Sequence, residues 1–187
     1  SLSKLDFVDG LAGIIKHSLI ADKNLFTKLE NIFINDKDLS DADLIKIIYE
    51  SSLIKAFIVS NDEKEKGDRA LLNFGHTYGH AFEAIQSLEG FSHGQAVGLG
   101  MICASHLSLL LEKISSEEFE KIKNLIKSVG LPYELPDNFK VNNFSEAMSR
   151  DKKILDKKLR FITLRGIGSA EITEDPPEDL VLKSINL

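Results

Sequence analysis

The chain has 187 residues, a formal net charge of −6 and a pI near 5.4. A chain this acidic lacks the basic patch or stripe of a nucleic-acid-binding protein, so we expect no nucleic-acid partner. Its 43% hydrophobic residues suffice for a buried core, and no apolar run reaches the roughly 18 residues of a membrane-spanning helix. The single cysteine, Cys103, excludes an internal disulfide and is expected to be a buried apolar residue. We expect a cytoplasmic protein that does not contact a membrane.

Apolar residues recur at helical spacing through the first third of the chain. The pattern predicts an amphipathic helix over residues 7–19 and a second over residues 22–34. Ser40 is the expected N-cap of a long third helix that continues to Val59. The polar, charge-mixed segment 60–68 then predicts a loop.

The middle of the chain predicts three further helices. The first runs continuously over residues 69–86, and glycines at residues 90–94 break it. The second, over residues 95–113, is apolar on nearly every side, which is typical of a helix at the centre of a bundle. Ser115 followed by Glu118 resembles a capping box and opens the third, which ends near residue 129.

Strand character is confined to the C-terminal part. After a short helical piece over residues 144–148, strand-like segments at residues 159–164 and 170–172 predict a hairpin, and a last helix starts near residue 179. The expected fold is therefore mainly α, a single multi-helical domain over residues 1–187 with a small β-hairpin near residues 159–172. No strand precedes a Gly-x-Gly-x-x-Gly sequence, so any nucleotide cofactor must be held mainly elsewhere.

Three of the 5 histidines lie between positions 76 and 93. His76 and His80 are four residues apart, so on a helix both rings project from one face and could share a metal or a substrate. Such a pair is more often structural, but His93 is expected to open a glycine-bounded turn where the backbone can approach a ligand closely. The clustering therefore favours a shared site.

Groups suited to a polyanion accompany the histidines. On the predicted helix Arg69 and Asn73 extend the histidine pair into a stripe at i, i+4, i+7 and i+11, and Lys55 precedes the polar loop. Buried cations and amides are costly unless they have partners, which a bound anion and a metal would supply. The alternative is that Arg69 and Asn73 merely cap neighbouring helices.

Several strings in the chain resemble the 3-dehydroquinate synthase family. The most specific are RALLNFGHTYGHAFE at residues 69–83 and HGQAVGLGM at residues 93–101. Segments 10–16, 62–67 and 151–168 agree with the family as well. The resemblance implies the helical C-terminal domain of a two-domain enzyme, whose N-terminal NAD-binding domain is absent from this chain and which forms a homodimer.

The resemblance also implies roles for individual residues. His76 and His93 match the histidines that bind zinc, or cobalt, and His80 matches a catalytic, substrate-contacting histidine. The family substrate, 3-deoxy-arabino-heptulosonate 7-phosphate, carries a carboxylate and a phosphate that need cations. Lys55 and Arg69 are implied to be catalytic, and the implied substrate-binding residues are Lys16, Lys55, Arg69, Asn73, His80 and Lys152, with Lys153 as the alternative to Lys152.

The reaction that the resemblance implies is a phosphate-eliminating cyclisation. An alcohol is transiently oxidised by NAD, phosphate leaves, the hydride returns, and an aldol step gives 3-dehydroquinate in the shikimate pathway of aromatic amino acid biosynthesis. Zinc fits as a Lewis acid, and because its histidine ligands must be neutral, activity should fade below about pH 6.5. Without the NAD domain we expect this lyase half to be inactive.

Alternative functions are another sugar-phosphate cyclase, an iron-dependent alcohol dehydrogenase-like domain, or a non-catalytic remnant of the fold. Arg69, Asn73 and Lys152 favour an acid phosphate as substrate over a simple alcohol. The persistence of the histidine cluster beside them argues against a remnant.

Two positions depart from the family pattern. Gly13 replaces the glutamate that serves as third zinc ligand, and in a helix interior glycine also costs about 1 kcal/mol relative to alanine. Either metal affinity is lost, or another acid or water completes the site. Gln95 replaces a glutamate after His-Gly and removes a charge from the surroundings of the metal, a milder change.

Overall fold

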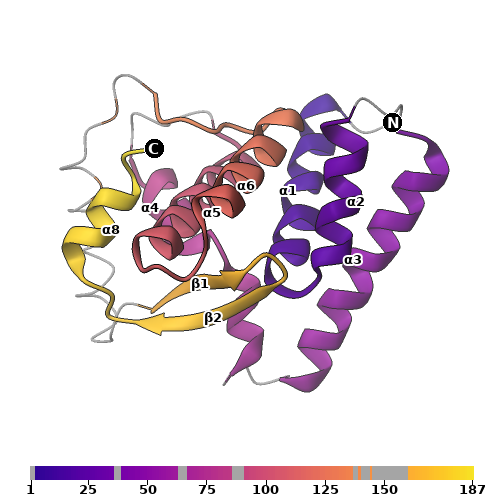
Figure 1. Cartoon of the computed structure of the whole chain (residues 1–187). Helices are drawn as coiled ribbons and strands as arrows, with labels where there is room; N and C mark the ends of the chain where they lie inside the picture. The colour runs from indigo at the N-terminus through magenta and orange to yellow at the C-terminus, as the bar shows by residue number, and fades with distance from the viewer. Residues whose placement is uncertain are drawn as a thin grey trace.

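The computed structural model describes residues 3–35, 39–62, 67–85, 91–136, 139, 144 and 160–187. Within these ranges helices pack around a central helix, and one antiparallel hairpin lies against them (Figure 1). The mainly α fold with a small hairpin is thus confirmed. The elements are α1 (Lys4–Ala21), α2 (Lys23–Phe33), α3 (Asp41–Asn61), the 3-10 helix η1 (Asp68–Asn73), α4 (His76–Glu83), α5 (His93–Leu110), α6 (Ser116–Ser128), β1 (Arg160–Gly166), β2 (Ser169–Glu174) and α8 (Glu178–Ser184).

Helix α5 occupies the centre, as its apolar sequence predicted. It contacts α1, α4, α6, α8 and β1, and Cys103 is fully buried within it. The approach of α4 is so close that a Cβ on Gly100 would lie 2.1 Å from the carbonyl oxygen of Gly75, and one on Gly79 would lie 3.3 Å from that of Ala96. Glycine at these positions lets the two backbones touch, which fixes the histidines of α4 relative to the start of α5.

Local capping chemistry sets where several helices begin. Ser40 and Ser115 cap α3 and α6 as predicted, and Ser115 forms a reciprocal capping box with Glu118. A further box opens α5, where the side chain of Gln95 accepts a hydrogen bond from the backbone N–H of Ser92 at 2.9 Å. Gln95 therefore satisfies a helix terminus that would otherwise lack a partner.

The single helix predicted over residues 69–86 is wrong. The chain forms η1, turns at Gly75 with φ of 81°, and only then begins α4 at His76. A side chain at Gly75 would meet the backbone nitrogen of Met101 at 2.8 Å, so packing against α5 requires both glycine and the break. The continuous stripe from Arg69 to His80 does not exist, although His76 and His80 still share one helix.

The predicted start of the next helix was also wrong. Helix α5 begins at His93 rather than residue 95, because Ser92 is its N-cap. His93 is thus the first residue of a helix and not part of an open turn.

The C-terminal hairpin is confirmed. Strands β1 and β2 pair antiparallel from Arg160 opposite Glu174 to Gly166 opposite Ser169, with an irregularity after Leu164. The turn is fastened to the helices, because the N–H of Gly168 donates to the carbonyl oxygen of Leu19 at 2.9 Å. The helical piece predicted at 144–148 lies outside the described residues except for Phe144, which is helical and buried. Among the described helices, none is long and apolar enough to span a membrane.

Candidate active site

The structure brings the three predicted histidines together around His76. His76 and His80 stand one turn apart on α4, with ring centres 5.7 Å apart, and His93 reaches the same place from the start of α5 with its ring centre 5.4 Å from that of His76. Two imidazoles that bind one tetrahedral metal through nitrogens at about 2.0–2.1 Å have ring centres roughly 5 Å apart. The spacing of His76 and His93 fits two ligands of a common metal.

His76 is held neutral and oriented. Burial lowers its pKa to about 4, and the nearby positive charge of Lys16 acts in the same direction. Its Nδ1 hydrogen-bonds the carbonyl oxygen of Phe74 at 3.3 Å, and since a carbonyl only accepts, Nδ1 donates and Nε2 keeps the lone pair. His76 therefore stays available to a metal well below pH 6.5, where the sequence-based expectation placed the loss of activity.

His93 is oriented by a residue that the sequence did not single out. The carboxylate of Glu83, in the last turn of α4, accepts a hydrogen bond from Nδ1 of His93 at 2.9 Å. Such a carboxylate fixes the ring and leaves Nε2 to bind a metal. Glu83 ends the family-like string at residues 69–83 and lies three residues after His80, but neither fact indicates His93 as its partner.

Gly13, where the family resemblance predicts a third metal ligand, carries no side chain. A Cβ built there meets no atom within 4 Å, in contrast to the crowded glycines of α4 and α5, so the position has room for a side chain but carries none. Among the described residues, no group of three or more histidine, cysteine, aspartate or glutamate side chains is arranged to hold a metal ion. The described residues thus offer two imidazoles whose spacing fits a metal, and α1 has room for a side chain at position 13.

A cationic region adjoins the histidines. Lys16 on α1 is half-buried, and its pKa is lowered to about 8, first by burial and then by the positive charge of Lys55 on α3. Lys16 also lowers the pKa of His76. Lys16 therefore lies within electrostatic reach of both Lys55 and His76. Two neighbouring ammonium groups repel each other, and a bound oxyanion would relieve that repulsion.

The remaining predicted residues divide by position. Arg69 and Asn73 lie on η1, which contacts both α1 and α3, the helices that carry the two lysines. The side chain of Asp62 fixes the start of η1, because one carboxylate oxygen accepts from the backbone N–H groups of Gly67 at 2.7 Å and Arg69 at 3.2 Å. Residues 152 and 153, the two alternative lysines, lie outside the described residues.

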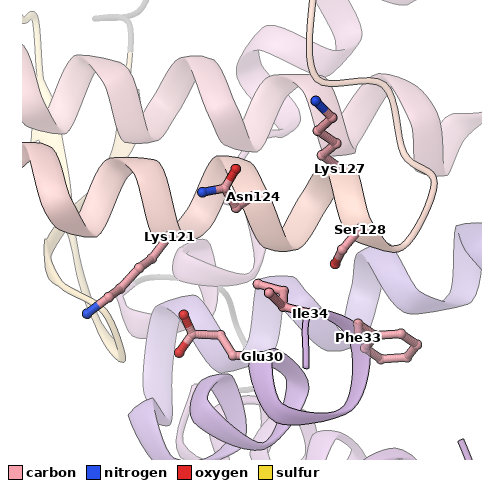
Figure 2. Close-up of a pocket in the computed structure, with 7 residues that line it drawn as sticks. All are labelled: Glu30, Phe33, Ile34, Lys121, Asn124, Lys127 and Ser128. Atoms are coloured by element: carbon pink, nitrogen blue, oxygen red, sulfur yellow. The ribbon is translucent and has the colours of Figure 1, made fainter. Parts of the chain in front are cut away.

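A groove elsewhere on the surface lies between α2 and α6 (Figure 2). Figure 2 shows the side chains of Glu30 and Lys121 extending toward the same space from the two helices. None of the predicted site residues lines this groove. It is separate from the histidine and lysine cluster.

Comparison with known proteins places the chain in a family. The family described as 3-dehydroquinate synthase C-terminal matches residues 10–154. The chain belongs to this family. It is 42% identical over 181 residues to a 3-dehydroquinate synthase of Thermoanaerobacter pseudethanolicus, covering 97% of the chain and 51% of that relative. A 3-dehydroquinate synthase of Vibrio atlanticus is 37% identical over 186 residues, covering 100% of the chain and 51% of the relative. The chain spans about half the length of these relatives.

Solved structures share the fold of this family member. A 2-epi-5-epi-valiolone synthase from Streptomyces hygroscopicus subsp. jinggangensis 5008, with NAD+ and Zn2+ bound, matches 100% of the chain and 52% of its own with a TM-score of 0.86 at 21% identity. A 2-deoxy-scyllo-inosose synthase complexed with carbaglucose-6-phosphate, NAD+ and Co2+ matches 99% of the chain and 53% of its own with a TM-score of 0.78 at 21% identity. At this identity the likeness supports the helical fold alone.

Proposed function

We propose that the chain is the metal- and substrate-binding half of a 3-dehydroquinate synthase. The enzyme would convert 3-deoxy-arabino-heptulosonate 7-phosphate to 3-dehydroquinate and release phosphate, as a cytoplasmic lyase of the shikimate pathway. The observation that carries the proposal is that Lys16 lies within electrostatic reach of both Lys55 and the oriented, neutral imidazole of His76. The phosphate and carboxylate groups of a phosphorylated acid supply the negative charge that would pair with these lysines.

The residues of the chain divide the work between binding and chemistry. Lys16 and Lys55 attract an oxyanion, and Arg69 and Asn73 add a guanidinium and an amide from η1. Lys152 is proposed to contribute a further cation. His80, exposed and one turn from His76, can reach the substrate and exchange a proton with it.

His76 and His93 are the proposed ligands of a zinc or cobalt ion. When bound, the metal would act as a Lewis acid on a substrate oxygen. Both rings present Nε2, since a carbonyl and a carboxylate hold their Nδ1 atoms. With glycine at position 13, water or an acid from outside the described residues would complete the coordination.

The proposed enzyme needs a second domain. NAD would be held mainly by an N-terminal domain, and the chain alone would be inactive. We further propose that the complete protein forms a homodimer.

A chimera tests the proposal. The matched half of the Thermoanaerobacter pseudethanolicus relative is replaced by this chain, and phosphate release from 3-deoxy-arabino-heptulosonate 7-phosphate is measured with NAD+ and Zn2+ or Co2+. We expect phosphate release, and a loss of at least about a hundredfold in a His80→Ala chimera. A chimera that folds and binds NAD+ but releases no phosphate would overturn the proposal.

The fold likeness to two other cyclases supplies a second candidate, a cyclase of a different sugar phosphate. The 42% identity to a 3-dehydroquinate synthase favours the first candidate. Offering the same chimera other phosphorylated keto-sugars that lack a carboxylate separates the two, because the first candidate requires the acid group.

A further inference from the structure

A buried hydrogen bond joins the two helices that carry the lysines. Nδ1 of His17 on α1 lies 2.7 Å from the hydroxyl oxygen of Ser51 on α3. His17 is 8% exposed and Ser51 is 5% exposed. A buried polar pair of this kind fixes geometry, because either group would be left without a partner if the helices slid past each other.

The two residues that form this bond are close in sequence to the two lysines. Lys16 directly precedes His17, and Lys55 follows Ser51 by four residues, one turn further along the same side of α3. A change in the register of α1 against α3 would therefore move one ammonium relative to the other.

The lysines themselves oppose this arrangement. Two like charges favour a larger separation, so a bond that fixes α1 against α3 acts against this repulsion. The link adds no third charge, because burial and then the charges of Lys16 and Lys55 lower the pKa of His17 to about 4. A neutral imidazole can hold Ser51 without repelling the ammonium groups.

We propose that His17 and Ser51 are positioning residues that hold Lys16 and Lys55 at the separation that a phosphate or carboxylate group requires. This inference rests on the proposed function for the identity of the anion. Lys16 is half-buried and Lys55 is exposed, so neither lysine is held firmly by its own packing. The buried, uncharged pair His17 and Ser51 would instead fix the distance between them.

The test uses the 187-residue chain with inorganic phosphate as the probe. Ser51→Ala and His17→Phe break the link from either side, and His17→Asn restores an amide close to the position of Nδ1. Ser108→Ala is the matched control, since its buried hydroxyl accepts a hydrogen bond from the N–H of Leu164 at 2.9 Å and links α5 to β1 instead. Calorimetry gives the phosphate dissociation constant, and NMR of lysine labelled at Cε gives the pKa of Lys16, with Lys55→Met as the positive control.

We expect Ser51→Ala and His17→Phe to weaken phosphate binding about tenfold and to raise the pKa of Lys16 toward its ordinary value, as Lys55→Met does. His17→Asn should recover most of both losses, and Ser108→Ala should change neither. If both broken-link variants fold and match Ser108→Ala in both measurements, the pair is merely structural and the inference is overturned. If the unsubstituted chain binds no phosphate, the proposed anion site fails, while the pKa of Lys16 in the same variants still decides whether the pair sets the lysine separation.

Discussion

The two parts of the candidate site are built by opposite means. In the cationic part, a buried hydrogen bond between the side chains of His17 and Ser51 links α1 and α3. In the histidine part, α4 and α5 meet backbone to backbone, which is possible only because Gly75 and Gly100 carry no side chain. The cationic part thus depends on two polar side chains, whereas the histidine part depends on glycines that have no side chain.

The same comparison shows which helix would have to supply the ligand that the proposed metal site lacks. The α4–α5 contact and the orientation of His76 and His93 are intact, so the histidine part has what it needs from its own helices. The donor that the proposed metal site lacks would come from α1, at Gly13, one turn before Lys16. Helix α1 therefore serves both parts, and it carries the cation but not the carboxylate.

Crowding the glycine contact should have the largest effect. In Gly100→Ala the new methyl group would lie 2.1 Å from the carbonyl oxygen of Gly75, a backbone atom that can yield only if α4 moves. We expect the free energy of unfolding to fall by about 3 kcal/mol or more, measured by urea denaturation with circular dichroism.

The control for that experiment is another helical glycine. A Cβ at Gly10 meets nothing within 4 Å, so Gly10→Ala should stabilise the chain by about 0.5–1 kcal/mol. Equal effects of the two substitutions would mean that α4 and α5 are not packed through their backbones.

Lowering the pH should destabilise the cationic part, because it protonates His17. Its pKa in the folded chain is about 4, below the ordinary 6.5, so between these values the unfolded chain binds more protons and acid favours unfolding. The penalty is absent above pH 6.5, grows as the pH falls, and is complete below pH 4. At pH 4.5 it should amount to roughly 2–3 kcal/mol.

His17→Asn should remove this part of the pH dependence. We expect the loss of unfolding free energy between pH 7.5 and pH 4.5 to be smaller in the variant by that amount, while other titrating groups act equally in both proteins. Urea denaturation at the two pH values measures it, with Ser108→Ala as a variant that keeps the full dependence. If His17→Asn and the parent chain lose the same free energy of unfolding between the two pH values, His17 is not held neutral.

Restoring a carboxylate at position 13 should complete the metal site. The open space at Gly13 accepts a side chain, so Gly13→Glu is expected to tighten zinc binding at least tenfold, or about 1.4 kcal/mol. Competition with a chromophoric chelator measures the affinity. Ser116→Glu, at the exposed start of α6, adds the same charge on a helix that carries no proposed site residue and should have no such effect. Unchanged affinity in Gly13→Glu would contradict the assignment of this position to the metal.

Features set by neighbouring residues were predictable from the sequence. Ser40 and Ser115 cap their helices through contacts three residues away, and the hairpin follows from two strand-like runs around a glycine turn. The break at Gly75 was not predictable, because apolar spacing continues across it. Its cause is the approach of Met101 and Val97, which only the folded chain reveals.

The candidate site divides in the same way. The proximity of His76 and His93 was expected from their clustering and from the family resemblance. The bond between His17 and Ser51 joins positions 34 residues apart and has no local spacing to indicate it. Glu83 was part of a recognised string, but its partner His93 comes from the next helix, so its role needed the structure.

The smallest expected effect tests whether the two parts act separately. In Glu83→Gln the amide oxygen can still accept the hydrogen bond from His93, but the charge that strengthens the ring as a ligand is lost. We expect zinc affinity to fall only a few-fold, below the roughly tenfold or more that is typical when such a partner is removed. Phosphate affinity should not change, because Lys16 and Lys55 belong to other helices. An equal loss of both affinities would mean that the histidine and cationic parts form one coupled unit rather than two that share α1.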